Sequence, residues 1–202
     1  MNYLAHLALA QPTSESVHGN LLGDFMKGSN IEQFSMPVQR GLQNHRFVDK
    51  YTDHHPEIHS IKNKFSAERR RFAAVIIDVS FDHYLIRHWS RFYEQSFAQF
   101  CEQRYALLEQ ALPYMPVTMQ STVNSMLKHR WLDVYATPQG LSGALDNTAT
   151  RIRFKHRFSG SIEEVLKHYH VLEQTFLSFY PQLMRSVSEQ KIESGHESGG
   201  SY

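Results

Sequence analysis

Residues 69–90 read RRRFAAVIIDVSFDHYLIRHWS, and this stretch decides the fold. Its first half, AAVIIDVSF, is apolar enough to form a buried strand. The apolar pattern continues into DHYLIRHWSRFY without turn residues, so the segment from about Glu68 to Phe92 is too long for a typical strand. We therefore predict one long helix here.

The rest of the chain shows the same helical periodicity, with no internal repeat and no Gly-rich phosphate loop. We expect Ser14 or Ser16 to cap a helix that runs to about Gly28, and Ser35 with Pro37 to open the next one. Further helices are expected over 3–10, from Pro56, and over 95–111, 117–135 and 161–186, whereas 136–160 is rich in Thr, Gly and Ser and least regular.

These patterns predict an all-α fold: a single-domain helical bundle over residues 1–186. The remaining residues, 187–202, are polar and rich in Ser and Gly, which is typical of a disordered tail. His196 is accordingly discounted as a ligand.

The composition excludes several classes of protein. Lys plus Arg number 21 and Asp plus Glu 20, so a net charge of +1 argues against a strongly basic nucleic-acid binder. The one cysteine, Cys101, excludes an intramolecular disulfide and a multi-thiolate zinc site, and its aromatic surroundings predict a buried thiol. No run reaches 18 apolar residues and no leader pattern is evident, so a cytoplasmic protein without membrane contact is expected.

Histidine and aspartate are concentrated near the start of the chain. Eight of 13 His and five of seven Asp fall in the first 90 residues, and histidine is the commonest metal ligand. Residues four apart share one face of a helix. The pairs at this spacing are Asn20 with Asp24, His45 with Asp49, and Asp78 with Asp82, which His83 follows. Three such faces turned inward could surround a metal ion; the alternative is solvated pairs or hydrogen-bonded core groups.

Two of these aspartates lie in apolar surroundings. Asp78 sits within AAVIIDVSF and Asp24 within GNLLGDFM. A buried carboxylate is costly unless it is paired or binds a cation, so both are expected to need a partner. A shared metal ion would satisfy them together with His45, Asp49 and nearby imidazoles, and a metal-free His–Asp or Arg–Asp network is the alternative.

Mixed imidazole and carboxylate ligation suits Mn²⁺, Fe²⁺ or Mg²⁺, and Zn²⁺ is also compatible. Such an ion polarises a phosphoryl oxygen and lowers the pKa of bound water, which indicates a hydrolase. A second cluster, Arg69, Arg70 and Arg71, is interpreted either as a solvated helix start or as a site for a phosphate or an acidic protein surface.

Four blocks together resemble the acyl carrier protein phosphodiesterases. They are MNYLAHLALA at 1–10, GNLLGDFMKG at 19–28, HRFVDKYTDHHPE at 45–57 and RRRFAAVIIDVSFDHYLIRHWS at 69–90. The resemblance extends to about residue 185. It implies removal of 4′-phosphopantetheine from holo-acyl carrier protein by phosphodiester hydrolysis, with Mn²⁺ as the usual ion, and an all-helical fold related to the HD-type phosphohydrolases.

The resemblance also implies a set of site residues. The chain lacks an adjacent His-Asp doublet, so the ligand set cannot be copied from an HD template. The residues carried over as ligands are Asp24, His45, Asp49 and Asp78, with His6 and Asp82 beside them in the metal site and His83 as a neighbour. His83 or His45 is expected to assist proton transfer, and the three arginines to contact the acidic carrier or the phosphate.

Two other functions fit the same residues. One is an HD-like phosphohydrolase acting on a nucleotide of the (p)ppGpp type, which shares the metal site and differs in substrate. The other is a non-catalytic helical module that binds carrier proteins. An interior carboxylate at Asp78 argues against the second, because a binding surface has no need of one.

Overall fold

A computed structural model describes residues 1–27, 30–150 and 156–194. Within these ranges the chain forms eleven α-helices and no strand, which confirms the predicted all-α class. The helices are α1 Tyr3–Leu9, α2 Ser14–Leu22, α3 Met36–His54, α4 Pro56–Lys62, α5 Ala73–Arg87, α6 Phe97–Ala111, α7 Val117–His129, α8 Trp131–Val134, α9 Pro138–Ala149, α10 Ile162–Lys167 and α11 Tyr169–Gln190.

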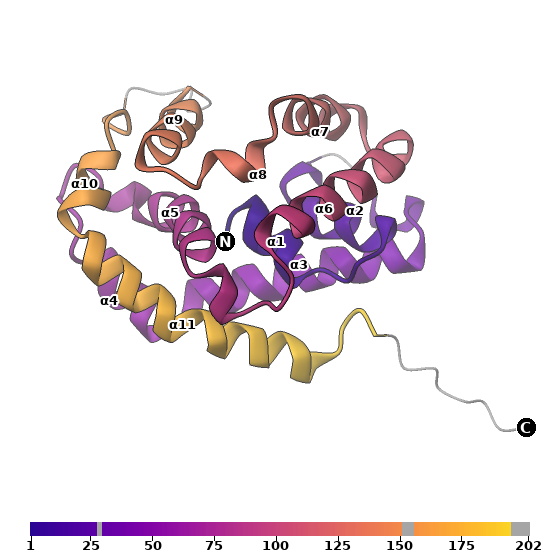
Figure 1. The fold of residues 1–202 in the computed structure, drawn as a ribbon, viewed down its shortest axis with the longest axis horizontal. Helices are drawn as coiled ribbons and strands as arrows, with labels where there is room; N and C mark the ends of the chain where they lie inside the picture. Colours follow the sequence, from indigo (N-terminus) through magenta and orange to yellow (C-terminus); the bar gives the residue numbers. More distant parts are fainter. Residues whose placement is uncertain (28–29, 151–155, 195–202) are drawn as a thin grey trace, which may run out of the picture.

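The short helix α1 lies in the middle of the molecule, and the other helices surround it (Figure 1). It contacts α2 and α5, while α11 runs along the outside against α3, α4 and α5. Leu4, Ala5 and Leu7 of α1 are completely buried. A helix of seven residues is not stable by itself in water, so the surrounding helices hold α1 in its helical form.

The central stretch is helical as predicted, but the helix is shorter than the expected span from Glu68 to Phe92. α5 follows a 3-10 turn at Arg70–Phe72 and ends at Arg87. The end has a packing cause: Trp89 stacks on Tyr93, and its indole nitrogen donates to the carbonyl of Gln95 at 2.8 Å. This contact turns the chain away from the helix axis before α6 begins.

The residues predicted to begin the second and third helices are only partly confirmed. α3 follows Ser35 and has Pro37 in its first turn. The N-cap of α2 is Thr13, whose hydroxyl accepts from the backbone nitrogen of Ser16, rather than Ser14 or Ser16. α2 also ends earlier than expected, at Leu22, where a 3-10 turn follows.

Two predicted helices are divided. The one expected over 117–135 breaks at Arg130, which adopts a left-handed backbone conformation with φ of 47° and separates α7 from α8. The one expected over 161–186 breaks at His168, between α10 and α11, and α11 continues to Gln190. The segment 136–160, expected to be the least regular, contains α9, and residues 151–155 lie outside the described part of the chain. Of the tail expected to be disordered, residues 195–202 lie outside the described part of the chain.

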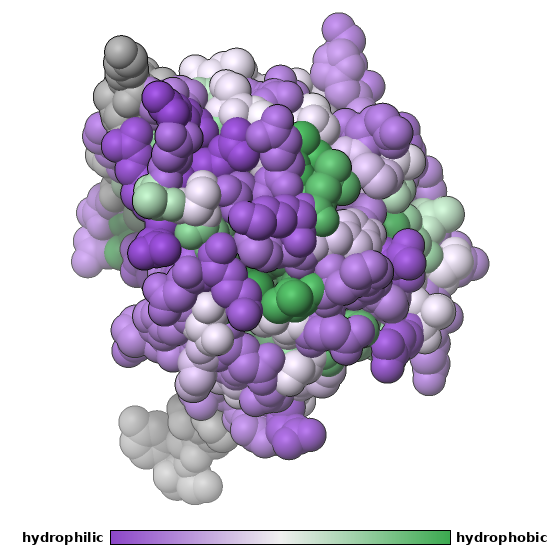
Figure 2. Space-filling model, turned by 90° about the vertical axis from the view of Figure 1, so that its left-hand side faces the viewer, coloured by the Kyte–Doolittle hydropathy of each residue, from purple (hydrophilic) through white to green (hydrophobic). Residues whose placement is uncertain are grey.

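The environment of Cys101 and the character of the surface agree with what the composition predicts. Cys101 is fully buried, and burial raises the pKa of its thiol to about 12, so it is the inert buried thiol that was predicted. On the face drawn in Figure 2, hydrophilic residues predominate and hydrophobic residues form small separate patches. Among the described residues, no helix combines the length and apolar character needed to traverse a bilayer.

Candidate metal centre

Helices α1, α3 and α5 bring a cluster of imidazoles and carboxylates together. Asp49 of α3 lies at its centre: its Oδ2 is 3.0 Å from Nε2 of His45, and its Oδ1 is 3.2 Å from Nε2 of His6. One nitrogen or oxygen atom from each of these three residues lies within 4.8 Å of the others, which is close enough to share a metal ion. The i, i+4 spacing of His45 and Asp49 thus gives the geometry that the sequence predicted.

The α-amino group of Met1 completes the cluster. Its nitrogen lies 3.3 Å from Oδ1 of Asp49 and 3.2 Å from Oδ1 of Asp78, so it bridges α3 and α5. Figure 1 marks the chain's N-terminus in the interior, beside α1 and α5. The sequence analysis missed this group, because residue type and spacing carry no signal for a main-chain amine.

The two imidazoles differ in charge. Burial lowers the pKa of His6 to about 3, so its ring is neutral. Its Nε2 contacts Asp49, whereas its Nδ1 has no hydrogen-bond partner among the described residues. Burial also disfavours the charged form of His45, but the hydrogen bond and charge of Asp49 outweigh it and raise the pKa of His45. The rings stack with their centroids 4.0 Å apart, which places both beside Asp49.

Burial and neighbouring charges also shift the pKa values of the carboxylates Asp49 and Asp78. Burial acts to raise the pKa of Asp49, yet its contacts with His45, His6 and the Met1 amine lower it far below the ordinary range. Burial raises the pKa of Asp78 despite the opposing charge of the Met1 amine. Asp78 is not completely buried, since 29% of its side chain is exposed. Its burial was therefore overestimated from the apolar sequence around it.

Two features fix His45 in its place. Its Nδ1 donates to the backbone carbonyl of Asn20 at 2.8 Å, which turns Nε2 toward Asp49. On the other side lies Gly23: a Cβ atom there would sit 2.1 Å from both Cδ2 and Nε2 of the ring. The site consequently requires the hydrogen atom of glycine at this position.

Asp24 differs from its predicted position. It lies in the 3-10 turn Gly23–Phe25 and is exposed, not in the interior of an apolar helix. Its carboxyl is nevertheless within electrostatic range of His45 and Asp49, and desolvation there raises its pKa. Asp24 therefore lies at the solvent side of the cluster.

Asp82 and His83 face other partners. Asp82 is completely buried, and its two oxygens accept from the backbone nitrogens of Leu4 at 3.0 Å and Ala5 at 3.1 Å. It thereby caps the first turn of α1. His83 uses both ring nitrogens, at 2.8 Å from the carbonyl of Tyr135 and 2.8 Å from the hydroxyl of Tyr169.

Comparisons with known proteins identify the family of the chain. The family model described as acyl carrier protein phosphodiesterase matches residues 1–183. The chain belongs to the acyl carrier protein phosphodiesterase family. It is 35% identical over 193 residues to the acyl carrier protein phosphodiesterase of Serratia proteamaculans strain 568, and 34% identical over 193 residues to that of Yersinia pestis. Both comparisons cover 95% of this chain and 100% of the relative, and no solved structure matches the chain.

In this member of the acyl carrier protein phosphodiesterase family, the cluster of His6, His45 and Asp49 fits a divalent metal ion. Two imidazoles and a carboxylate form a donor set that such ions accept. His6 supplies the strongest indication, because its buried Nδ1 has no hydrogen-bond partner among the described residues and a neutral ring can donate a lone pair. The hydrogen bond from His45 to a main-chain carbonyl is the usual support of a metal-binding imidazole.

Two other features of this family member stand apart from the cluster. The guanidinium of Arg69 donates to Glu163 and to the carbonyls of Arg157 and Ser159, while Arg70 donates to the carbonyl of Phe65.

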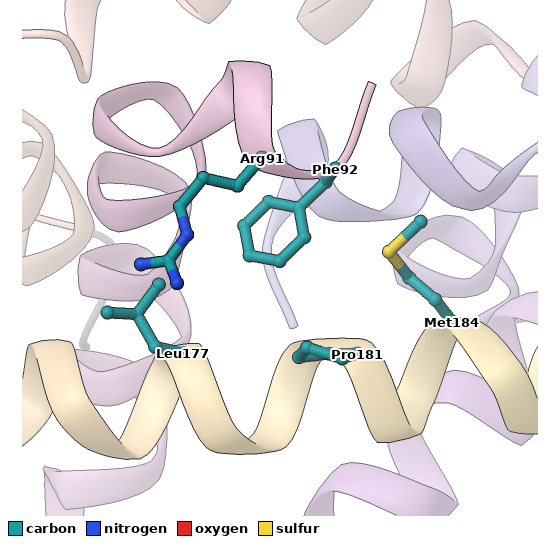
Figure 3. Close-up of a pocket in the computed structure, with 5 residues that line it drawn as sticks. All are labelled: Arg91, Phe92, Leu177, Pro181 and Met184. Atoms are coloured by element: carbon teal, nitrogen blue, oxygen red, sulfur yellow. The ribbon is translucent and has the colours of Figure 1, made fainter. Parts of the chain in front are cut away.

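A pocket between the 3-10 turn at Trp89–Arg91 and α11 is lined by one arginine and four apolar residues (Figure 3). These are Arg91, Phe92, Leu177, Pro181 and Met184. Since none is a carboxylate or an imidazole, the pocket lacks groups for hydrolysis.

Proposed function

We propose that this protein hydrolyses the phosphodiester of holo-acyl carrier protein, which releases 4′-phosphopantetheine and leaves apo-acyl carrier protein with a free serine hydroxyl. The observation that carries the proposal is the convergence of His6, His45 and Asp49 in a chain of the acyl carrier protein phosphodiesterase family. The names of the relatives supply the substrate class, and the cluster supplies the means of hydrolysis.

The same three residues are proposed to hold one divalent ion, with Mn²⁺ as the first choice over Mg²⁺, Fe²⁺ and Zn²⁺. Asp24 and Asp78 are the further carboxylates of the site. When bound, such an ion polarises a phosphoryl oxygen and lowers the pKa of a water molecule, so that a nucleophile forms near neutral pH.

The chain's own residues orient this chemistry. The Asn20 carbonyl sets the tautomer of His45, and the two rings shield one side of Asp49 from water. Asp24, exposed and with a raised pKa, is the group proposed to carry a proton for the departing serine oxygen. The contacts of His83 with Tyr135 and Tyr169 favour Asp24 over His83 for this task.

The carrier protein is proposed to dock beside the exposed side of α3. Arg46 and Lys50 follow His45 and Asp49 in this helix; both are exposed and make no ion pair within residues 1–27, 30–150 and 156–194. The guanidinium of Arg69 is already engaged by Glu163 and two carbonyls, so α3 offers the less occupied positive charges. An acidic carrier surface would be attracted to them.

The test is mass spectrometry of holo-acyl carrier protein after incubation with the protein, with and without Mn²⁺. The expected result is loss of the phosphopantetheine mass only when protein and metal are both present. Asp49→Asn should reduce the rate by about 100-fold or more, because it removes the carboxylate shared by both imidazoles.

Asp53→Asn is the matched control, since exposed Asp53 lies one turn further along α3 and pairs with half-buried Lys62. It should leave the rate unchanged. An unmodified carrier after incubation with metal and protein would overturn the proposal, and cleavage of (p)ppGpp in a parallel incubation would redirect it to nucleotides.

A further inference from the structure

The segment 191–194, which follows α11, sends one side chain back into the fold. Lys191 adopts a left-handed backbone conformation with φ of 49°, which turns the chain at the end of the helix. Half-buried Glu193 lies just beyond this turn and contacts α2. Within the described residues, each hydrogen bond from this segment to α2 is accepted by the Glu193 carboxylate. One charged group therefore fastens the segment to α2.

Two buried donors of α2 receive this carboxylate. The hydroxyl of Ser16 donates to one oxygen of Glu193, and Nδ2 of Asn20 donates to the other at 2.8 Å. Ser16 is only 3% exposed, and Asn20 is completely buried. A buried donor without an acceptor is costly. One donor for each of two oxygens is an arrangement that suits a planar carboxylate.

A buried positive charge lies close to the same place. Arg104 of α6 is 5% exposed, and its guanidinium donates to the carbonyls of Ala10 at 3.1 Å and Gln11 at 3.3 Å. Its Nε has no hydrogen-bond partner among the described residues. Burial lowers the pKa of Arg104, while Tyr93 and Glu193 act in the opposite direction, so Glu193 lies within electrostatic range. A buried charge is costly unless it is compensated, so a carboxylate at this position stabilises Arg104.

Asn20 connects the carboxylate to the candidate metal centre. Its side-chain oxygen accepts from Nδ2 of Asn44 at 2.9 Å, and its backbone carbonyl accepts from Nδ1 of His45 at 2.8 Å. An amide side chain donates from one end and accepts at the other. An acceptor at Glu193 therefore turns the oxygen of Asn20 toward Asn44, so that one residue of α2 contacts both the segment after α11 and α3.

We propose that Ser16 and Asn20, with Arg104 in electrostatic range, form a binding site for one carboxylate, and that Glu193 fills this site as an internal ligand. Residues 191–194 are then a latch. When closed, it holds Asn20 where its carbonyl orients His45; when open, it exposes the site to an external carboxylate. Glu193 is a positioning residue, because it acts on His45 through Asn20. The carboxylate site is independent of the proposed function, whereas the effect on a metal ion rests on it.

The test is chemical rescue of Glu193→Ala in the full chain, with acetate as the external carboxylate. The variant should unfold about 2–8 °C below the unaltered chain, because two buried donors lose their acceptor. Acetate should raise its unfolding temperature until the site is saturated, since a ligand that binds only the folded state stabilises it by mass action. Sodium chloride at the same ionic strength should not. The unaltered chain, whose site is filled, measures the general effect of acetate.

Two further variants isolate the site. Glu189→Ala removes an exposed carboxylate from the last turn of α11 and should respond to acetate no more than the unaltered chain. Adding Ser16→Ala to Glu193→Ala removes one of the two donors and should abolish the extra response. If Glu193→Ala does not fold in buffer, its refolding yields in acetate and in sodium chloride are compared, and acetate should give the higher yield. Equal responses of Glu193→Ala and the unaltered chain, or equal yields in the two salts, would overturn the inference.

Mn²⁺ affinity, measured by calorimetry, tests the link to His45. Without acetate, Glu193→Ala should bind Mn²⁺ about tenfold more weakly than the unaltered chain, the lower end of the range seen when groups supporting metal ligands are removed. Acetate should reduce this difference, and equal affinities without acetate would overturn the latch. If the unaltered chain neither binds Mn²⁺ nor cleaves the carrier protein, the proposed function fails, while the unfolding temperatures still decide the carboxylate site.

Discussion

At the scale of single residues, Gly23 shows how closely the site is packed. Its backbone has φ of −52° and ψ of −38°, which any residue adopts, so the requirement for glycine comes from the imidazole of His45 alone. The hydrogen bond from His45 to Asn20 prevents the ring from moving away on the other side. The position of this proposed metal ligand depends on the absence of one methyl group.

Gly23→Ala should therefore displace His45. We expect Mn²⁺ affinity to fall about tenfold or more, together with a loss of about 1–3 kcal/mol of stability from overpacking. Gly143→Ala is the control: Gly143 lies in α9, with no atom within 4 Å of the added Cβ, and should gain about 0.5–1 kcal/mol. Calorimetric titration with Mn²⁺ and thermal unfolding measure both effects; equal Mn²⁺ affinities for the two variants would contradict this account of Gly23.

Lys50 tests the proposed docking side of α3. Reversing the charge in Lys50→Glu should raise KM for holo-acyl carrier protein with little change in kcat, because an exposed charge affects encounter more than chemistry. The effect should shrink as salt is added. Lys128→Glu on α7 makes the same change of net charge elsewhere on the surface. If it raises KM as much as Lys50→Glu, the charge has no local role.

At the scale of elements, Asp82 joins α5 to α1. Its two oxygens satisfy two backbone nitrogens at the start of α1, which would otherwise lie buried without acceptors. α1 carries His6, and Met1 precedes it, so this one carboxyl fixes the entry of two groups into the cluster. Asp82 supports the site without lying in it.

Asp82→Asn replaces one acceptor oxygen with a donor and should cost about 1–3 kcal/mol of unfolding free energy.

Burial raises the pKa of Asp82 to about 7, against the opposing hydrogen bonds of Leu4 and Ala5. The folded state therefore binds more protons than the unfolded state between about pH 4 and 7, and this group's contribution to stability declines as the pH rises through that window. The difference in unfolding free energy between Asp82→Asn and the unaltered chain, measured by urea titration, should narrow from pH 4 to 7; a widening difference would contradict the raised pKa.

The sequence predicts the helices better than it predicts which groups the side chains contact. The apolar run around Asp78 is long enough to identify a helix, and the spacing of His45 and Asp49 places both on one face. Which carboxylate is buried depends on what lies opposite it in the fold. Asp78 and Asp82 have similar neighbours in sequence, yet one faces the Met1 amine and the other the backbone of α1.

At the scale of the whole molecule, the segment after α11 returns to the second helix of the chain. Glu193 accepts hydrogen bonds from the hydroxyl of Ser16 and from the side-chain amide of Asn20, the latter at 2.8 Å. Asn20 is the residue whose carbonyl orients His45. Residues far apart in sequence thus support the same imidazole.

Glu193→Gln replaces one of the two acceptor oxygens and should lower the unfolding free energy by about 1–2 kcal/mol. Glu189→Gln, an exposed change in the last turn of α11, should have no measurable effect. Urea titrations of the two variants provide the comparison, and identical midpoints would show that the Glu193 contacts contribute nothing.

The interior position of α1 has a consequence for synthesis on the ribosome. α1 is synthesised before α5 and is too short to persist alone, and Asp82, which caps its first turn, belongs to α5. The native contacts of α1 with α5 therefore cannot form until α5 has been translated. During that interval His6 and the apolar side chains of α1 are accessible to chaperones and proteases, and a slowly translated stretch before α5 would prolong this exposure.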